Sequence, residues 1–193
     1  MGRLAMIFAL VLTAYSGVAE ATLVEAMGIE EMASRSSFVV VGKVMSKMAG
    51  LKDGRISTAY EVSVTRGWTD AENPQSRVKV VLPGGQIDNL AQTASGVPEF
   101  RIGEEVLLFL WAPPTTEIKT YRLLGMSMGH FQIVREAEAW AISDRRGLVT
   151  VDKAKRTQSE GDLLRVRLKS LEMQIEKGMR PEFRRIEHSV RNP

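Results

Sequence analysis

The chain has 193 residues, 44% of them hydrophobic and 25% charged, and its formal net charge is +3 at pH 7. This composition is ordinary for a globular protein of about one domain. The chain contains no cysteine, which excludes disulfide bonds, so its stability must come from a hydrophobic core of adequate size.

The amino-terminal segment has the three parts of a secretory signal peptide. Arg3 supplies a positive charge, Leu4–Tyr15 is an uncharged apolar run, and Ala19 and Ala21 are small residues three and one positions before a cleavage point. The apolar run is short for a membrane span, and no later stretch approaches the ~20 apolar residues that a span needs. We therefore predict a signal peptide at residues 1–21, no transmembrane span, and a periplasmic or secreted bacterial protein.

The first predicted elements are a helical lead-in and a buried strand. Residues 22–36 favour a short helix, because Glu30 and Glu31 fall in an early turn, where the helix dipole stabilises acids. Phe38–Val44 is nearly all β-branched, which is typical of a strand covered on both faces.

Two half-buried strands follow. Asp53-Gly54 is a strong turn signal, and Ile56–Val64 then alternates between apolar and polar residues. Residues 77–82 alternate in the same way and end at Pro83. A long polar loop is expected from Gly84 to Phe100.

The loop gives way abruptly to an apolar segment. After a turn at Gly103-Glu104, six apolar residues follow each other in Val106–Trp111. This run predicts a central strand with no solvent-facing side. Further strands are expected at residues 121–126, 130–134, 139–143 and 148–151, the last two joined as a hairpin with Gly147 in the left-handed conformation.

The carboxyl-terminal part, residues 153–193, is predicted to form a helix and a basic tail. From Leu164 the apolar residues recur at helical spacing as far as Met179, with Ser159 or Asp162 as the cap and Gly178 just past the end. The apolar stripe favours packing on the rest of the domain over dimerisation or partner binding. Residues 144–193 contain 13 basic and 8 acidic residues, so the tail is also a candidate for binding an anionic polymer.

About seven short strands flanked by helices are typical of a small closed β-barrel. The strand and Gly/Pro-turn pattern from Ser36 to Val134, including "VKVVLPGG" and "GVPEFRIGEEVLLFL", resembles the oligonucleotide/oligosaccharide-binding (OB) barrel of the netrin-like group. That group includes the tissue inhibitors of metalloproteinases, and uncharacterised exported bacterial proteins share the pattern. The resemblance implies a mainly β, OB-like barrel domain over residues 22–152. The inhibitors' zinc-binding amino-terminal cysteine has no counterpart here, where the expected mature chain begins at Thr22.

Motifs for catalysis, metal or cofactor binding are weak. Residues 125–129, "GMSMG", match a nucleophile elbow with His130 adjacent, but the following residues alternate as a strand and not as the required helix. A bulge or a sharp bend in a barrel strand is the preferred interpretation. Two histidines, no cysteine and no phosphate-binding motif predict no metal, no cofactor and no enzymatic activity.

The candidate binding surface is the long loop and the aromatic residues that flank it. Barrels of this kind bind on one face and its bordering loops. The predicted binding rim consists of Trp68, Gln86, Asp88, Phe100 and Trp111.

The sequence thus favours an exported, non-enzymatic binding or assembly module of the bacterial cell envelope, whose partner is another envelope or secreted protein. Two alternatives remain open: a protease inhibitor that acts by loop insertion, and a binder of nucleic acid or another anionic polymer through the basic tail.

Overall fold

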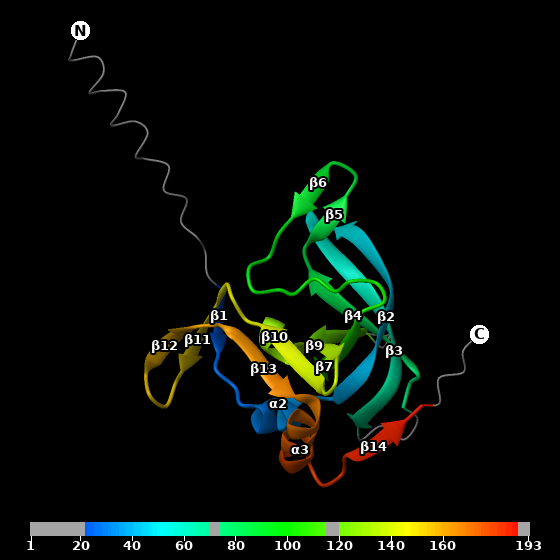
Figure 1. The fold of residues 1–193 in the computed structure, drawn as a ribbon. Coiled ribbons are helices and arrows are strands. Elements are labelled where there is room, and N and C mark those ends of the chain that lie inside the picture. Colours follow the sequence, from blue (N-terminus) through cyan, green and yellow to red (C-terminus); the bar gives the residue numbers. More distant parts are fainter. Residues whose placement is uncertain (1–21, 70–73, 115–119, 189–193) are drawn as a thin grey trace, which may run out of the picture.

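Most of the chain folds into β-strands (Figure 1). The computed structural model describes residues 22–69, 74–114 and 120–188, so the predicted signal peptide lies outside the described residues. None of the helices in these segments is long and apolar enough to cross a membrane. The elements are β1 (Thr22–Glu25), α2 (Ile29–Arg35), β2 (Phe38–Lys52), β3 (Arg55–Thr69), β4 (Arg77–Pro83), β5 (Gly85–Ile87), β6 (Leu90–Gln92), β7 (Glu105–Trp111), β8 (Thr120–Leu123), the 3₁₀ turn η1 (Met126–Gly129), β9 (His130–Arg135), β10 (Ala139–Asp144), β11 (Leu148–Asp152), β12 (Thr157–Glu160), β13 (Leu163–Arg167), α3 (Leu168–Gly178) and β14 (Arg184–Glu187).

One large sheet contains nine of these strands. Its order is β13-β10-β9-β7-β2-β3-β4-β8, and β14 pairs with the remaining part of β3. All of its pairs are antiparallel except β4 with β8, and β8 also pairs with β7. The strands predicted from alternation are therefore confirmed, and the fold is mainly β with two α-helices.

The longest hairpin is made by β2 and β3, which are 15 residues each. Asp53 and Gly54 form its turn with positive φ angles of 51° and 72°, as the turn signal predicted. On its other side β2 pairs with β7 only as far as Lys43. Beyond that residue β2 pairs with β3 alone, while β4 pairs with the other side of β3 from Ser57 to Ser63. We call this part of the β2–β3 hairpin the arm, and it ends beside β5 (Figure 1).

The central strand β7 is buried on both faces, as predicted. Val106, Leu108 and Leu110 enter one core, enclosed by the curved strands β2, β3 and β4. Leu107 and Phe109 enter a second core, which lies under α2 and α3. Each successive side chain of β7 enters one core or the other, so the strand has no solvent-facing side. This explains why the sequence changes abruptly from polar to apolar where the loop ends and the strand begins.

The predicted helical lead-in is correct only in its second half. Residues 22–25 form β1, which pairs in parallel with β11, and the helix is confined to Ile29–Arg35. The free edge of β11 offers backbone partners to an extended segment, and the local helical pattern is too short to compete.

The predicted hairpin between β10 and β11 is wrong. The turn itself forms, with Gly147 at φ 81°, but β10 pairs with β9 and β13 while β11 pairs with β1 and β12. The two strands thus belong to different sheets. A turn signal specifies a change of direction and leaves the pairing to the available sheet edges.

The carboxyl-terminal helix is shorter than predicted. Residues 163–167 form β13 on the edge of β10, and α3 begins at Leu168. Leu168, Leu171 and Ile175 are buried, so the packing interpretation of the apolar stripe is confirmed. Gly178 was predicted just past the end of the helix, but it is the last residue of α3 and its φ is not positive. A Cβ there would lie 2.2 Å from the Glu30 carbonyl oxygen, so glycine is needed for the close contact with α2.

The basic tail is not a free segment over the residues described. Arg184–Glu187 form β14, which pairs with β3 from Arg66 to Thr69. Arg185 forms ion pairs with Glu176 and Glu187 at 3.5 and 3.1 Å. Its charge is therefore partly neutralised within the fold.

Candidate functional site

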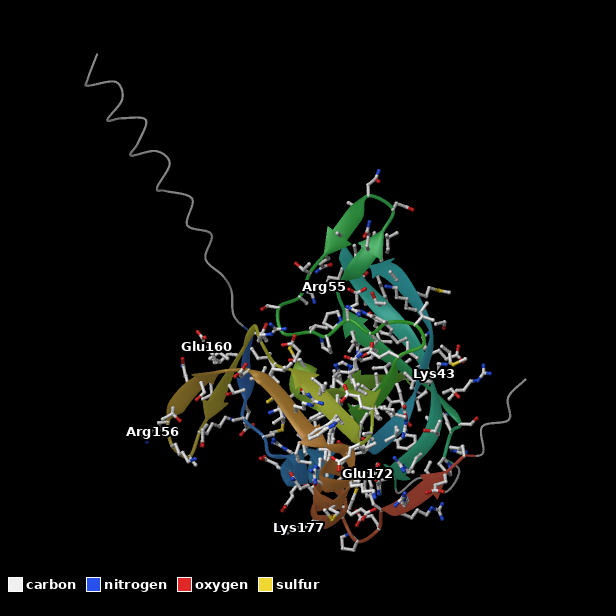
Figure 2. The ribbon with its side chains drawn as sticks, in the orientation of Figure 1. Lys43, Arg55, Arg156, Glu160, Glu172 and Lys177 are labelled. Carbon is white, nitrogen blue, oxygen red and sulfur yellow. The ribbon has the colours of Figure 1, made fainter. Side chains whose placement is uncertain are left out.

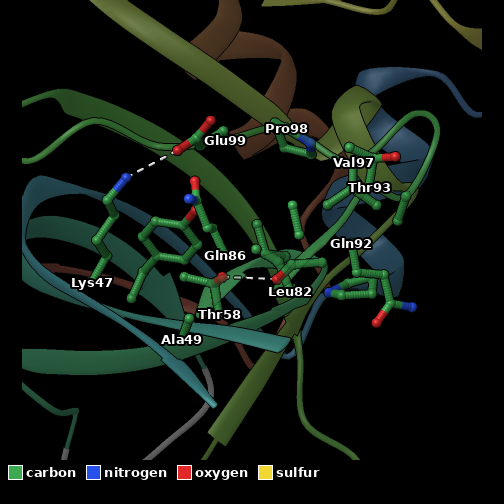
Figure 3. Close-up of a pocket in the computed structure, with 16 residues that line it drawn as sticks. Lys47, Ala49, Thr58, Leu82, Gln86, Gln92, Thr93, Val97, Pro98 and Glu99 are labelled. Atoms are coloured by element: carbon green, nitrogen blue, oxygen red, sulfur yellow. Dashed lines mark hydrogen bonds and ion pairs between the residues drawn. The ribbon is translucent and has the colours of Figure 1, made fainter. Parts of the chain in front are cut away.

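A pocket of about 500 Å³ lies between the β2–β3 arm and the segment that connects β4 to β7 (Figure 3). We call it the loop pocket. Side chains of β2 and β3 form one wall, and the β5–β6 hairpin and residues 93–99 form the other. The principal polar lining residues are Lys47, Thr58, Tyr60, Gln86, Gln92 and Glu99.

Two adjacent glycines allow the segment after β4 to pass close to the β2–β3 arm. Gly84 and Gly85 have φ angles of 92° and 136°, which residues with a side chain rarely adopt. A Cβ on Gly85 would lie 2.3 Å from the Thr58 hydroxyl oxygen. That hydroxyl donates a hydrogen bond of 2.8 Å to the Gly84 carbonyl, so the close approach of the two segments is built into the site.

Gln92 fixes the far side of the hairpin. Its side-chain carbonyl accepts a 2.7 Å hydrogen bond from the backbone N–H of Ile56, and the Gly84 N–H donates to the Ile56 carbonyl at 2.8 Å. The predicted loop is therefore ordered by the strand that it covers.

The lining residues of the loop pocket carry one positive and one negative charge, on Lys47 and Glu99. Lys47 Nζ and Glu99 Oε1 are 2.9 Å apart across its opening (Figure 3). The hydrogen bond to Glu99 raises the pKa of Lys47, and burial raises the pKa of the Tyr60 phenol. The pocket thus offers amide and hydroxyl groups around one ion pair, which suits an uncharged polar or backbone-like ligand more than a multiply charged one.

The structure does not bring the five predicted rim residues together. Gln86 lines the loop pocket, and Asp88 lies at the tip of the same hairpin with φ 50°. Trp68 and Phe100 are not exposed, with 2% and 0% of their surface accessible. Trp111 is partly exposed, but it follows Leu110, which pairs with Phe38 at the opposite end of β2 from Lys47.

Phe100 supports the site from within. Its ring centroid lies 4.7 Å from that of Tyr60 and 4.8 Å from that of His130. Phe100 therefore anchors the segment after Glu99 to the core. Of the three rings in this cluster, only Tyr60 lines the loop pocket.

Sequence reasoning missed Lys47, Thr58 and Tyr60 as lining residues, and it did not single out Glu99 within the predicted loop. Thr58 and Tyr60 lie on the inward face of a strand that alternates clearly, so it was predictable that their side chains point away from solvent. Their exposure to a pocket was not, because it depends on where the loop crosses the arm. Lys47 and Glu99 are 52 positions apart, and no local pattern links them.

The residues of "GMSMG" make a sharp bend, as predicted, but the bend connects two separate strands, β8 and β9, and does not lie within one strand. Gly125 has φ 66°, η1 follows, and β9 begins directly at His130. The Ser127 N–H donates to the Gly96 carbonyl at 3.0 Å, and its carbonyl accepts from the Ser143 hydroxyl at 2.9 Å. Ser127 Oγ is buried with no hydrogen-bond partner among the described residues.

His130 lies beside an acid. Its Nε2 atom is 3.7 Å from Glu104 Oε1. Burial raises the pKa of Glu104, but His130 and the hydrogen bond from the Arg101 N–H together lower it more, so that the net shift is downward. Ser127, His130 and Glu104 line a second pocket of about 370 Å³ on the other side of residues 97–99. Over the described segments, no group of three or more histidine, aspartate or glutamate residues is arranged to hold a metal ion.

Comparison of the chain with protein-family models, with curated proteins and with solved structures finds no match.

Proposed function

We propose that this protein is an exported, non-enzymatic binding module of the bacterial cell envelope that holds a segment of a partner protein in the loop pocket. The observation that carries the proposal is the construction of that pocket. Two left-handed glycines, the Thr58 hydrogen bond and the Lys47–Glu99 ion pair hold a polar, neutral recess open beside an ordered arm. A preorganised recess reduces the entropy lost when a ligand binds.

The strand pairing supports an OB-like barrel as the scaffold of this module. The strands β7, β2, β3, β4 and β8 each pair with the next, and β8 pairs again with β7 through Leu110–Leu123 and Trp111–Arg122. We infer that these five strands form a small closed barrel, with residues 84–104 crossing one end of it. Loops at the end of such a barrel are a common place for a binding site.

The structure gives less support to binding through the basic tail. Arg185 is ion-paired, and Lys177 Nζ lies 2.8 Å from Glu30 Oε1. Cations that are already neutralised by neighbours contribute little to the attraction of a polyanion.

Photo-crosslinking tests the proposal. The full chain is expressed in a bacterial host with p-benzoylphenylalanine at Gln86, which is exposed and lines the loop pocket, and irradiated in intact cells. Arg156, which is exposed on the β11–β12 hairpin, is the control position.

We expect a discrete protein adduct from position 86 and none from position 156. Adducts that are equal at both positions, or absent from both, would contradict a binding site at the loop pocket. A protease as the captured protein would select the inhibitor alternative.

A further inference from the structure

The outer part of β2 has an open backbone edge. The pairing of β2 with β7 ends at Lys43, and the last backbone contacts on that side join Val44 to Gly103 and Glu104. From Ser46 to Lys52, β2 pairs with β3 alone. These seven residues span roughly 20–23 Å of strand.

The turn of the hairpin determines which backbone groups face outward. Lys52 and Arg55 close a two-residue turn and form a hydrogen-bonded pair, and such pairs alternate along an antiparallel ladder. Ile56, in the next pair, accordingly directs its N–H and carbonyl away from β2, toward Gln92 and Gly84. By the same alternation, Lys47, Ala49 and Leu51 direct their backbone groups away from β3, where no described residue bonds to them.

These three residues also face the loop pocket. Lys47 and Ala49 are lining residues, and Leu51 pairs with Ile56 on the same face of the arm. A strand added to this edge would place every second side chain on the loop-pocket side. We propose, on the basis of the proposed function, that the partner segment is an extended peptide that adds to β2 as a further antiparallel strand.

The charges of the arm indicate which peptide it accepts. Residues 43–55 contain four basic residues and one acid, Asp53. Lys47 is paired with Glu99, whereas Lys43, Lys52 and Arg55 are exposed with no ion-pair partner among the described residues. Figure 2 shows Lys43 and Arg55 on the arm. Between these ends two apolar side chains are exposed, Leu51 on the loop-pocket face of the arm (55%) and Met48 on the opposite face (76%). The arm therefore fits a peptide with an apolar centre and acidic ends.

A second copy of the chain fits the edge less well. Two copies of the chain could pair antiparallel through this edge of β2. The symmetric pairing that uses all three outward residues is centred on Ala49 and places Lys47 of each copy opposite Leu51 of the other. Residues 46–52 contain two lysines and no acid, so neither copy would supply an acidic partner for the basic side chains of the other.

The probe for this proposal is the peptide acetyl-EEVTVTVTVEE-amide, titrated against the full-length protein by isothermal titration calorimetry. Its valines are the residues expected to face the loop pocket and to hydrogen-bond to β2. We expect N-methylation of the valine amides to weaken binding about tenfold or more, because each lost hydrogen bond contributes about 1 kcal/mol. N-methylation of the threonine amides should leave the affinity within about twofold.

Protein variants test the same geometry. Ala49→Pro removes an outward N–H without removing a bond to β3, so it should abolish peptide binding in a folded protein. The double change Lys52→Glu with Arg55→Glu should weaken binding of the acid-ended peptide and favour KKVTVTVTVKK. Arg156→Glu on the distant β11–β12 hairpin is the charge control (Figure 2). Where Ala49→Pro fails to fold, amide hydrogen exchange of the unaltered protein replaces it: the peptide should protect Lys47, Ala49 and Leu51.

Three outcomes would overturn the proposal. Equal effects of the two N-methylated peptides would mean recognition through side chains. A dimer that dissociates in Ala49→Pro would assign the edge to a second copy. Absence of peptide binding, together with a specific adduct at position 86, would leave the loop pocket as the binding site and remove strand addition as its mode.

Discussion

At the scale of single residues, Gly85 is the position where the loop pocket depends most on the absence of a side chain. We expect Gly85→Ala to destabilise the protein by about 1–3 kcal/mol, because alanine at φ 136° is strained and its Cβ would clash with Thr58. Gly50→Ala is the control, since nothing lies within 4 Å of a Cβ there and its φ is not positive. Urea unfolding should place the control within about 0.5 kcal/mol of the unaltered protein. Equal effects of the two changes would contradict the role assigned to Gly85.

Ser127 gives a prediction about chemistry at the same scale. Its hydroxyl is buried and unpaired among the described residues, while its backbone holds Gly96 and Ser143. We therefore expect Ser127→Ala to leave the crosslinking at position 86 intact and the free energy of unfolding unchanged or slightly higher. Covalent labelling of Ser127 by a fluorophosphonate probe would instead indicate a nucleophilic serine.

Tyr60 makes the stability of the protein depend on alkaline pH. Because burial raises the pKa of Tyr60 above its ordinary value of 10.0, the folded chain keeps the phenol proton at a pH where the unfolded chain has lost it. This stabilisation is fully present below pH ~10 and is lost as the pH rises through the folded-state pKa. Lys47, whose pKa is also raised, loses its pairing with Glu99 over the same alkaline range.

The measurement is urea unfolding at several pH values from 8 to about 11.5. Tyr60→Phe should show a shallower fall in the free energy of unfolding above pH ~10 than the unaltered protein. An identical pH profile for the two proteins would contradict the assignment to Tyr60.

At the scale of elements, β7 contributes to the stability of the core, whereas the outer part of the β2–β3 arm is exposed and contributes little to stability. Leu108 is fully buried in the core between β2, β3, β4 and β7, so Leu108→Ala should cost about 2–5 kcal/mol in the free energy of unfolding. Leu51→Ala, on the exposed part of the arm, should cost within about 0.5 kcal/mol. Urea unfolding measures both, and a large loss at Leu51 would indicate that the arm is part of the core.

At the scale of the whole molecule, the amino-terminal pattern predicts processing. The protein purified from its native source should begin near Thr22 and be recovered outside the cytoplasm, as intact-mass measurement and cell fractionation can show. A cytoplasmic protein that retains Met1 would remove the basis for an envelope function, and the loop pocket would then need a cytoplasmic partner.

The sequence by itself determined those elements in which the pattern of side chains and the final environment agree. The alternation in Ile56–Val64, the turn at Asp53-Gly54 and the unbroken apolar run of β7 each reflect a local cause. A strand with one buried face must alternate, and a strand with two buried faces must not.

Only the tertiary structure decided the pairing and the site. Residues 22–25 and 163–167 became strands because β11 and β10 offered free edges, and the helical patterns in those segments were too weak to prevent it. Trp68 and Phe100 are buried, whereas Lys47 and Glu99 meet across the loop pocket from 52 positions apart. The physical reason is the same in each case. A strand edge or a pocket wall is completed by a segment that is distant in the sequence, and no local pattern of side chains specifies which segment that is.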